Sequence, residues 1–351
     1  MVNYLALALQ TRCVAVNGLS IGDARLAIDG GVTRIVNQIE AARALLGPRL
    51  RLVVLPEYAL TGFPMGEGIA EWRAKAAIAL DGPEVARLMD CAIGAGIHLA
   101  VNAYEAESIF PGLYFQCCFV IAPSGTIVLR YRRLISMFAP SPIDVLDRYR
   151  DHYGDELFPI AETEIGVLAA IASEEILYPE IARIVAMRGA EVLLHSSGEM
   201  ASPLPTPKAI CRRARAVENL AFVVSANAAS LESGNIAEAT TDGGSEIVDY
   251  RGQILARAGQ GETIVAHAEI DLAPLRRART TVGMGAMLAR VPAGAAADAY
   301  ARLDTHPING LLDQRGEVVV PDRAYFQQRQ QNVIAQLQAA HRLIPTPGVG
   351  E

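Results

Sequence analysis

The chain has 351 residues, 51% of them hydrophobic, which is enough for a sizeable core in one large domain or two ordinary ones. A net charge of −7 and a pI near 5.5 exclude the basic footprint of bulk nucleic-acid binding. No run approaches the roughly 20 apolar residues of a membrane span, and the N-terminal stretch has neither a basic leader nor a small-residue cleavage site. We therefore predict a globular, cytoplasmic protein without a nucleic-acid or membrane partner.

The first half of the chain alternates apolar runs with stretches of helical period, which is typical of a layered α/β fold. We predict a strand near the start and then a helix that Asp23 caps and Gly47-Pro48 ends. A buried strand "RLVVLPE", a helix near 83–95 and a strand "IHLAVNAYE" follow. The segment "QCCFVIAPSGTIVLRYRRL" predicts a hairpin that turns at Ser124-Gly125.

The second half repeats this order after residue 160. We predict a strand "IGVLAAIA", a helix from Pro179 to near Gly189, a strand "AEVLLHSS", a helix over about 207–219, a strand "AFVVSANAA" and a hairpin within "SEIVDYRGQILARA". Two halves of similar order indicate one domain with internal pseudo-symmetry. From about residue 276 the chain becomes Arg- and Ala-rich, and we expect it to pack on a neighbouring subunit or on its own surface.

Three predicted strand ends carry polar groups. Glu57 directly follows a buried strand, so partial desolvation makes it a plausible proton carrier, or else a structural carboxylate that caps local amides. Arg132 and Arg133 end the hairpin, where arginines are commonly solvated or salt-bridged. Residues 173–175, "SEE", stand at a strand-to-helix junction, where capping would explain all three.

Together these segments resemble the nitrilase (carbon–nitrogen hydrolase) superfamily. The resemblance rests on "LVVLPEYALTGFP", "LRYRRL", "IGVLAAIASEEILYPEIARIVAMRGAEVLLHSS", "RARAVENLAFVVSANA" and "GGSEIVDYRGQILA", in that order. It implies a four-layer αββα sandwich over residues 1–275, and we predict that the Arg- and Ala-rich segment 276–351 is an extension at a subunit interface. It also implies a homodimer or larger homo-oligomer, and a Glu–Lys–Cys triad that hydrolyses small amides, nitriles or carbamoyl compounds.

The sequence departs from this family pattern at two of the three triad positions. Glu57 matches the family base, whereas the lysine position falls on Arg133 and the cysteine position on Ser173. The alignment of Ser173 is supported from both sides, because it lies seven residues after Gly166 and five before Tyr178. The resemblance thus predicts Glu57, Arg133 and Ser173 as the catalytic residues.

Four more residues are predicted to bind the substrate. Glu175 matches a Glu often found two residues past the nucleophile, and Tyr58 adjoins Glu57. Asp144 is the nearest carboxylate to the missing second Glu of the family. His195 ends the strand after the Ser173 helix and could face the same pocket, although a lone His is more often a core or rim residue.

Other reactive side chains are weaker candidates. Five cysteines (Cys13, Cys91, Cys117, Cys118 and Cys211) form an odd count without metal-ligand spacing, so reduced, mostly buried thiols are expected. Arg212, Arg213 and Arg215 could bind an anionic substrate group or form a solvated or interface helix face. No phosphate-binding glycine loop or dinucleotide fingerprint appears, so we expect no cofactor and no metal.

The triad substitutions leave several functions open. A serine hydroxyl has no accessible anion and needs a base such as Glu57 or His195, while Arg133 stays charged and could clamp Glu57 with two parallel hydrogen bonds. A pseudoenzyme that binds a small ligand would explain both changes. A divergent hydrolase with Ser173 as nucleophile, a laboratory Cys-to-Ser replacement, and an oligomeric scaffold are the alternatives.

Overall fold

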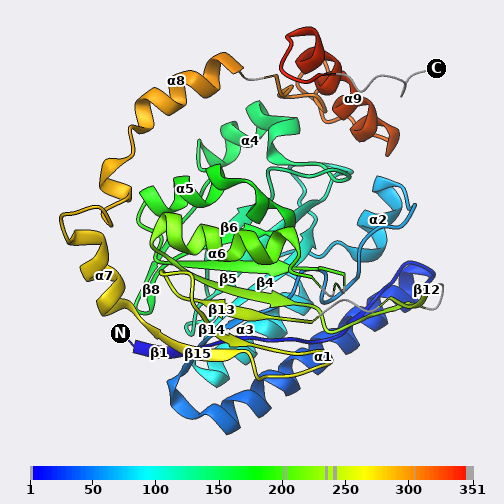
Figure 1. The fold of residues 1–351 in the computed structure, drawn as a ribbon. Helices are drawn as coiled ribbons and strands as arrows, with labels where there is room; N and C mark the ends of the chain where they lie inside the picture. The colour runs from blue at the N-terminus through cyan, green and yellow to red at the C-terminus, as the bar shows by residue number, and fades with distance from the viewer. Residues whose placement is uncertain are drawn as a thin grey trace.

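Two six-stranded sheets pack face to face in this computed structural model, which describes residues 3–200, 202, 204–233, 236–239, 243–303 and 305–344 (Figure 1). The first sheet has the order β15-β1-β3-β4-β5-β6. Its strands are β1 (Asn3–Ala8), β3 (Leu50–Val54), β4 (His98–Glu105), β5 (Phe115–Ile121), β6 (Ile127–Arg132) and β15 (His267–Asp271).

The second sheet has the order β7-β8-β9-β10-β13-β14. Its strands are β7 (Ala161–Thr163), β8 (Gly166–Ala172), β9 (Val192–Ser197), β10 (Phe222–Asn227), β13 (Glu246–Val248) and β14 (Ile254–Arg257). In each sheet one antiparallel strand precedes three parallel strands, and two antiparallel strands follow them. This shared pattern confirms the predicted pseudo-symmetry. A small third sheet joins β2 (Cys13–Val14), β11 (Leu231–Ser233) and β12 (Ile236–Ala239).

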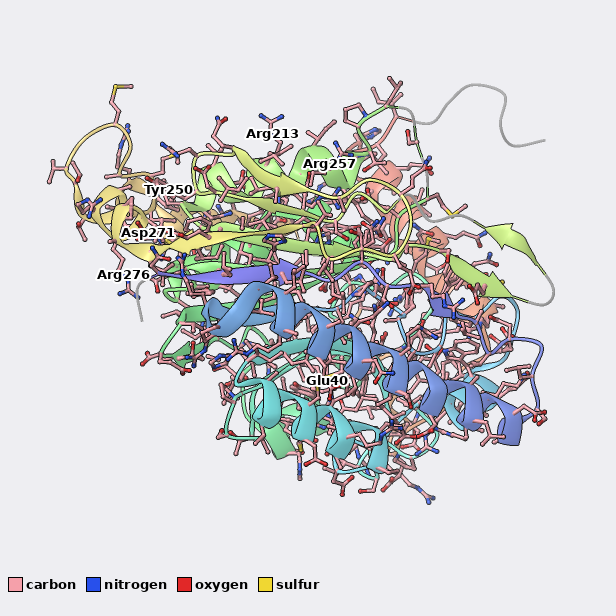
Figure 2. All side chains as sticks on the ribbon, turned by 90° about the horizontal axis from the view of Figure 1, so that it is seen from below. Glu40, Arg213, Tyr250, Arg257, Asp271 and Arg276 are labelled. Carbon is pink, nitrogen blue, oxygen red and sulfur yellow. The ribbon has the colours of Figure 1, made fainter. Side chains whose placement is uncertain are left out.

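Helices α1 and α3 cover the outer face of the first sheet, and α5 and α6 cover that of the second. The α-helices of the described part of the chain are α1 (Ile21–Leu46), α2 (Ile69–Ala76), α3 (Pro83–Ala95), α4 (Leu146–Tyr153), α5 (Pro179–Met187), α6 (Pro207–Asn219), α7 (Leu272–Thr280), α8 (Ala293–Leu303) and α9 (Ala324–Ala339). Figure 2 shows α1 and α3 side by side as one outer layer, with the labelled Arg213 and Arg257 on the opposite side of the molecule. Among the described residues, no helix is long and apolar enough to cross a membrane.

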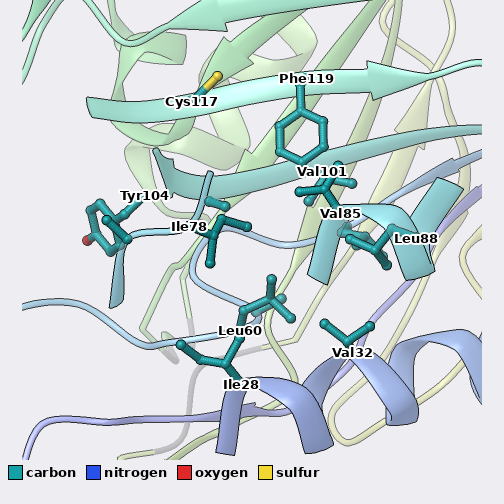
Figure 3. Packing of buried hydrophobic residues seen from close by; sticks show 14 of the residues in the cluster. Ile28, Val32, Leu60, Ile78, Val85, Leu88, Val101, Tyr104, Cys117 and Phe119 are labelled. Atoms are coloured by element: carbon teal, nitrogen blue, oxygen red, sulfur yellow. The ribbon is translucent and has the colours of Figure 1, made fainter. Parts of the chain in front are cut away.

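Three buried clusters separate the four layers. Ile28 of α1 and Leu88 of α3 pack against Val101 and Phe119 of the first sheet (Figure 3). A second cluster fills the space between the sheets, and a third joins the second sheet to α5 and α6. The expected αββα sandwich is therefore confirmed. Because both faces of the first sheet are covered, the neighbouring Cys117 and Cys118 are both buried, on opposite faces.

The structure corrects two local predictions. The side chain of Ser20, not Asp23, caps α1, because its oxygen accepts a hydrogen bond from the backbone N–H of Asp23. The short helices α2 and α4 were not predicted, since eight residues carry little periodic signal.

The C-terminal segment runs around the outside of the body, through α7 and α8 to α9 near α4 (Figure 1). Helix α7 spans the predicted boundary at residue 275. Phe326 of α9 is 2% exposed, and the guanidinium of Arg329 pairs with the buried carboxylate of Asp144. The segment thus packs on its own chain in this region, and its place at a subunit interface stays a prediction.

Candidate active site

A cavity of about 540 Å³ opens where strands of the two sheets end. Glu57, Arg133 and Ser173 all line it, so the structure brings together the three residues that the sequence predicts as catalytic. Glu57 follows β3, while Arg133 and Ser173 directly follow β6 and β8. The ends of the sheets are tied to each other, because the backbone N–H of Glu57 donates to the carbonyl of Ser197 at the end of β9 (3.2 Å).

Aromatic and sulfur-containing side chains form much of the cavity wall. Tyr58 stacks on Tyr104 with ring centroids 5.6 Å apart and contacts Phe63 at 5.7 Å. Burial and the adjoining Glu57 carboxylate raise the pKa of Tyr58 well above its usual value, so its phenol stays neutral. Tyr58 lines the cavity, as the sequence predicts for a substrate-binding residue. Such a wall suits a small organic ligand with few charges.

The Glu57 carboxylate is 1% exposed and only partly satisfied. Its Oε1 accepts a hydrogen bond from the side-chain amide of Gln116 (2.7 Å), and its Oε2 has no hydrogen-bond partner among the described residues. A Cβ placed on Gly198 would lie 3.3 Å from that Oε2, so a glycine leaves space beside it. Glu57 therefore presents a free acceptor oxygen in a largely dry wall of the cavity.

Arg133 holds Glu57 in a different way from the expected clamp. Its Nη1 lies 3.5 Å from Oε1 of Glu57 and donates to Oε1 of Gln116 (2.7 Å), while its Nη2 pairs with the carboxylate of Glu174. Its Nε donates to the carbonyl of Ile135 (2.6 Å). Burial alone would lower the pKa of Arg133, but the acidic groups around it raise that pKa above its ordinary value. The guanidinium is thus a permanently charged linker between two carboxylates.

Ser173 occupies a strained corner between β8 and α5. Its φ is 50°, in the left-handed region that few residues other than glycine adopt, so the tight turn carries an energetic cost. The side chain does not cap the following helix, contrary to the capping explanation. Its Oγ instead accepts a hydrogen bond from Nζ of Lys208 in the first turn of α6 (2.9 Å).

Glu175 stabilises this corner through hydrogen bonds and does not line the cavity. Its Oε1 accepts from the backbone N–H groups of Leu134 (2.8 Å) and Ile135 (3.0 Å). Its Oε2 accepts from the hydroxyl of Tyr131 (2.8 Å) and from the N–H of Ala172 (3.2 Å). One fully buried carboxylate therefore fixes the backbone after Arg133 to the backbone before Ser173. Its described hydrogen bonds are all within the protein, and its predicted contact with a substrate stays a prediction.

Comparison with known proteins matches residues 13–280 to the family model described as Carbon-nitrogen hydrolase. The chain belongs to the carbon–nitrogen hydrolase family, in the nitrilase superfamily. It is 30% identical over 256 residues to a formamidase of Bradyrhizobium sp., covering 72% of this chain and 68% of that protein. It is 27% identical over 208 residues to the omega-amidase NIT2 of Xenopus tropicalis, covering 58% and 72% of the two chains.

Solved structures share the fold of this carbon–nitrogen hydrolase. A carbon–nitrogen hydrolase from Helicobacter pylori superposes with a TM-score of 0.65 at 23% identity, over 85% of this chain and 98% of that one. A double mutant of the amidase from Nesterenkonia sp. AN1, solved in complex with acrylamide, superposes with a TM-score of 0.60 at 17% identity, over 85% and 98% of the chains. Superfamily relatives thus bind small amides such as acrylamide.

Two further predicted substrate-binding residues of this carbon–nitrogen hydrolase, like Glu175, do not line the cavity. His195 is fully buried, and its ring nitrogens bond the hydroxyl of Ser225 (2.8 Å) and the carbonyl, not the hydroxyl, of Ser173 (2.9 Å). Burial lowers the pKa of His195 well below its usual value, so the ring is neutral and supports the corner. Asp144 caps Ser141 and pairs with Arg329 of α9. Neither residue lines the cavity, and their contact with a substrate stays a prediction.

The arginines of α6 do not form the solvated face or the anion site that the sequence left open. Arg212 is 2% exposed and pairs with Glu199 (2.9 Å) and Glu246 (2.7 Å). Arg215 is also buried and donates to the carbonyl of Ile176 (2.9 Å). Only the exposed Arg213 of the three fits a solvated position. These pairs anchor α6 and thereby the first turn that carries Lys208.

The five cysteines are free thiols, and four are buried. Cys13 lines the cavity, but burial raises its pKa to about 12, so it stays protonated and is a poor nucleophile. Burial likewise raises the pKa of Cys118 to about 12. No group of described residues has the His, Cys, Asp and Glu content to hold a metal ion.

Sequence reasoning missed two functional side chains, Lys208 and Gln116. Lys208 is 35 positions from Ser173, and Gln116 links Glu57 to Arg133 from β5 of the first sheet. One signal for Lys208 was available. The 351 residues contain only two lysines, Lys75 and Lys208, and the second stands at the start of a predicted helix.

Proposed function

We propose that this protein hydrolyses the carbon–nitrogen bond of a small amide, with Ser173 as the nucleophile. The observation that carries this proposal is the position of Ser173 on the cavity wall, at a strained corner that faces the same cavity as Glu57. Left-handed backbone at a non-glycine residue costs energy and is concentrated at functional sites. The similarity to formamidase and omega-amidase supports an amide as the substrate class.

In the proposed reaction the oxygen of Ser173 bonds to the amide carbonyl carbon, and its proton passes to the carboxylate of Glu57. The carbonyl electron pair moves to oxygen and returns as the C–N bond breaks, and Glu57 gives the proton to the departing amine. Water then attacks the carbonyl carbon of the resulting ester, and Glu57 takes a proton from that water. The bond between the acyl carbon and the oxygen of Ser173 breaks, and Glu57 returns the proton to that oxygen. The sum is amide plus water to carboxylic acid plus amine.

The experiment is turnover of a panel of small amides, nitriles and carbamoyl compounds, followed by ammonia release. Intact-protein mass spectrometry, with peptide mapping to Ser173, detects the acyl adduct. Ser173→Ala should abolish both signals, whereas Ser124→Ala, in an exposed hairpin turn, should keep them. Absence of product and adduct with every compound, or equal turnover by Ser173→Ala, would refute the proposal.

A second candidate is a protein that binds a small amide without turnover. The pairing of Arg133 with both Glu57 and Glu174 favours it, because the carboxylate that would serve as the base is already engaged by a fixed cation. In that case calorimetry should detect binding to the same amides, no ammonia should form, and Ser173→Ala should leave the affinity nearly unchanged.

We also infer that the protein forms at least a homodimer, as the family resemblance implies. Two apolar side chains after α7 support this, because Val282 is 98% exposed and Met284 is 89% exposed. Light scattering of the full chain tests the inference, and a monomer mass over the concentration range of the assay would overturn it.

A further inference from the structure

Lys208 is the cation that touches the proposed nucleophile. Its Nζ donates a hydrogen bond of 2.9 Å to Oγ of Ser173, and both side chains line the cavity. It reaches there from the first turn of α6, which Thr206 caps and Pro207 begins. The N-terminal half of α6 is fixed by the buried Arg212, so this turn is held against the site.

The described residues make no other use of the charge of Lys208. Within the described part of the chain, no carboxylate lies within ion-pair distance of its Nζ. Lys75, the other lysine, differs from Lys208 in having a counter-ion. Its ammonium pairs with Glu71 (2.9 Å) and donates to the carbonyl of Asn17 (2.8 Å). A cation without a counter-ion beside a hydroxyl is free to stabilise negative charge that develops there.

Arg133, which the sequence resemblance aligns with the family lysine, is committed to other contacts. Its three nitrogens donate to Ile135, Gln116 and Glu174. No described contact joins it to Oγ of Ser173. A guanidinium used in this way positions the carboxylate of Glu57 and has little freedom to follow a reacting oxygen.

We propose that Lys208 is the catalytic cation of this site and that Arg133 is a positioning residue. This inference rests on the proposed function. The Lys208 ammonium keeps its three protons throughout and donates one hydrogen bond to the oxygen of Ser173 as that oxygen loses its proton to Glu57. As the carbonyl oxygen gains negative charge, the same ammonium stabilises it. The cation of the site is thus supplied by α6 and not by the end of β6.

The first test measures the cation directly and needs no amidase activity. In Ser173→Cys, the rate of alkylation by iodoacetamide against pH reports the pKa of the introduced thiol, and peptide mass spectrometry separates it from the native cysteines. Adding Lys208→Met should raise that pKa by roughly one unit or more, because an opposite charge at hydrogen-bond distance is removed. Adding Arg213→Met, which removes an exposed cation of the same helix, should leave it unchanged. An unchanged pKa in Ser173→Cys with Lys208→Met would overturn the proposal.

The second test uses turnover by the full chain. Lys208→Met should lower kcat by about 100-fold with a small change in KM, as loss of one transition-state donor does. Lys208→Arg keeps a positive charge and should fall between the wild type and Lys208→Met, with Arg213→Met as the control. If Lys208→Arg is as poor as Lys208→Met, Lys208 is a base. If only KM rises, and only for anionic amides, Lys208 binds a substrate anion. Either result overturns the proposal.

The two proposals can fail separately. If the wild type forms no product and no adduct, the proposed function fails while the thiol measurement still decides whether Lys208 acts on position 173. If the wild type turns over and Lys208→Met is equally fast, Lys208 has no catalytic role and the proposed function stands. Lys208→Gln, with equal thermal stability as the criterion for folding, repeats the test in case Lys208→Met does not fold.

Discussion

Nη1 of Arg133 lies 3.5 Å from Oε1 of Glu57, and the two side chains are 7% and 1% exposed. Gln116 reinforces this pair, because its amide donates to Glu57 and its carbonyl accepts from Arg133. A buried charge whose partner is removed remains in a low-dielectric surrounding without compensation. The pair therefore matters to the stability of the site.

Arg133→Met should lower the free energy of unfolding by about 3–5 kcal/mol, because it leaves the buried Glu57 carboxylate without its cation. Urea denaturation measures this change. Arg188→Met is the matched control. Arg188 pairs with Glu156 at the surface, where the two side chains are 42% and 44% exposed, so this substitution should change the free energy of unfolding little. Equal effects of the two variants would contradict the structural role of Arg133.

Glu175→Gln should disturb the site without touching the cavity. The carboxylate accepts four hydrogen bonds, and an amide in its place would turn N–H groups toward N–H and O–H donors. We expect a loss of about 2–3 kcal/mol in stability and a reduced kcat, because the backbone on both sides of the cavity loses its common anchor. Unfolding and turnover of Glu175→Gln test this, with Glu162→Gln as a surface control; wild-type stability would contradict it.

Cys13 lines the cavity but should play no part in the chemistry. Its pKa is raised to about 12, chiefly by burial, and its sulfur accepts a hydrogen bond from the N–H of Gly62 (3.0 Å). Cys13→Ser keeps a hydroxyl for these contacts, so turnover should stay within about threefold of the wild type. Loss of the acyl adduct in Cys13→Ser, with Ser173→Ala still active, would show that the thiol is the nucleophile.

Much of the fold could be predicted from local sequence, whereas the catalytic positions followed from the resemblance to the nitrilase superfamily. Glu57 follows β3 of the first sheet and Ser173 directly follows β8 of the second, so strand order alone does not show that they line one cavity. Helices α3 and α6 have the predicted bounds, because Pro begins each of them and Gly96 ends α3.

The contacts that cross the chain could not be predicted in this way. Lys208 reaches Ser173 because the buried ion pairs of Arg212 fix α6 over the end of β8, and no pattern within α6 encodes that placement. Asp144 is turned from the cavity by Arg329, which lies 185 positions away. His195 has the right strand position but points to the carbonyl of Ser173, since its ring must satisfy two nitrogens in a dry core.

The buried His195 should make the free energy of unfolding depend on pH. Burial, followed by the charge of Arg212, lowers its pKa well below the usual value of about 6.5. Below about pH 6.5 the unfolded chain binds a proton at this residue and the folded chain does not. The free energy of unfolding should therefore fall as the pH drops from about 6.5 to 5, by up to about 1.4 kcal/mol per pH unit from this group.

His195→Gln removes the titrating ring, so its unfolding free energy should depend less on pH over that interval, even though its stability at pH 7 is lower. Burial also lowers the pKa of His98, which contributes in the same direction in both proteins and cancels in the difference. Urea denaturation at several pH values between 5 and 7 gives the two slopes. If the free energy of unfolding has the same pH slope in both proteins, His195 is protonated in the folded protein over this interval. The hydrogen bond from its Nε2 to the carbonyl of Ser173 would then be donated by an imidazolium.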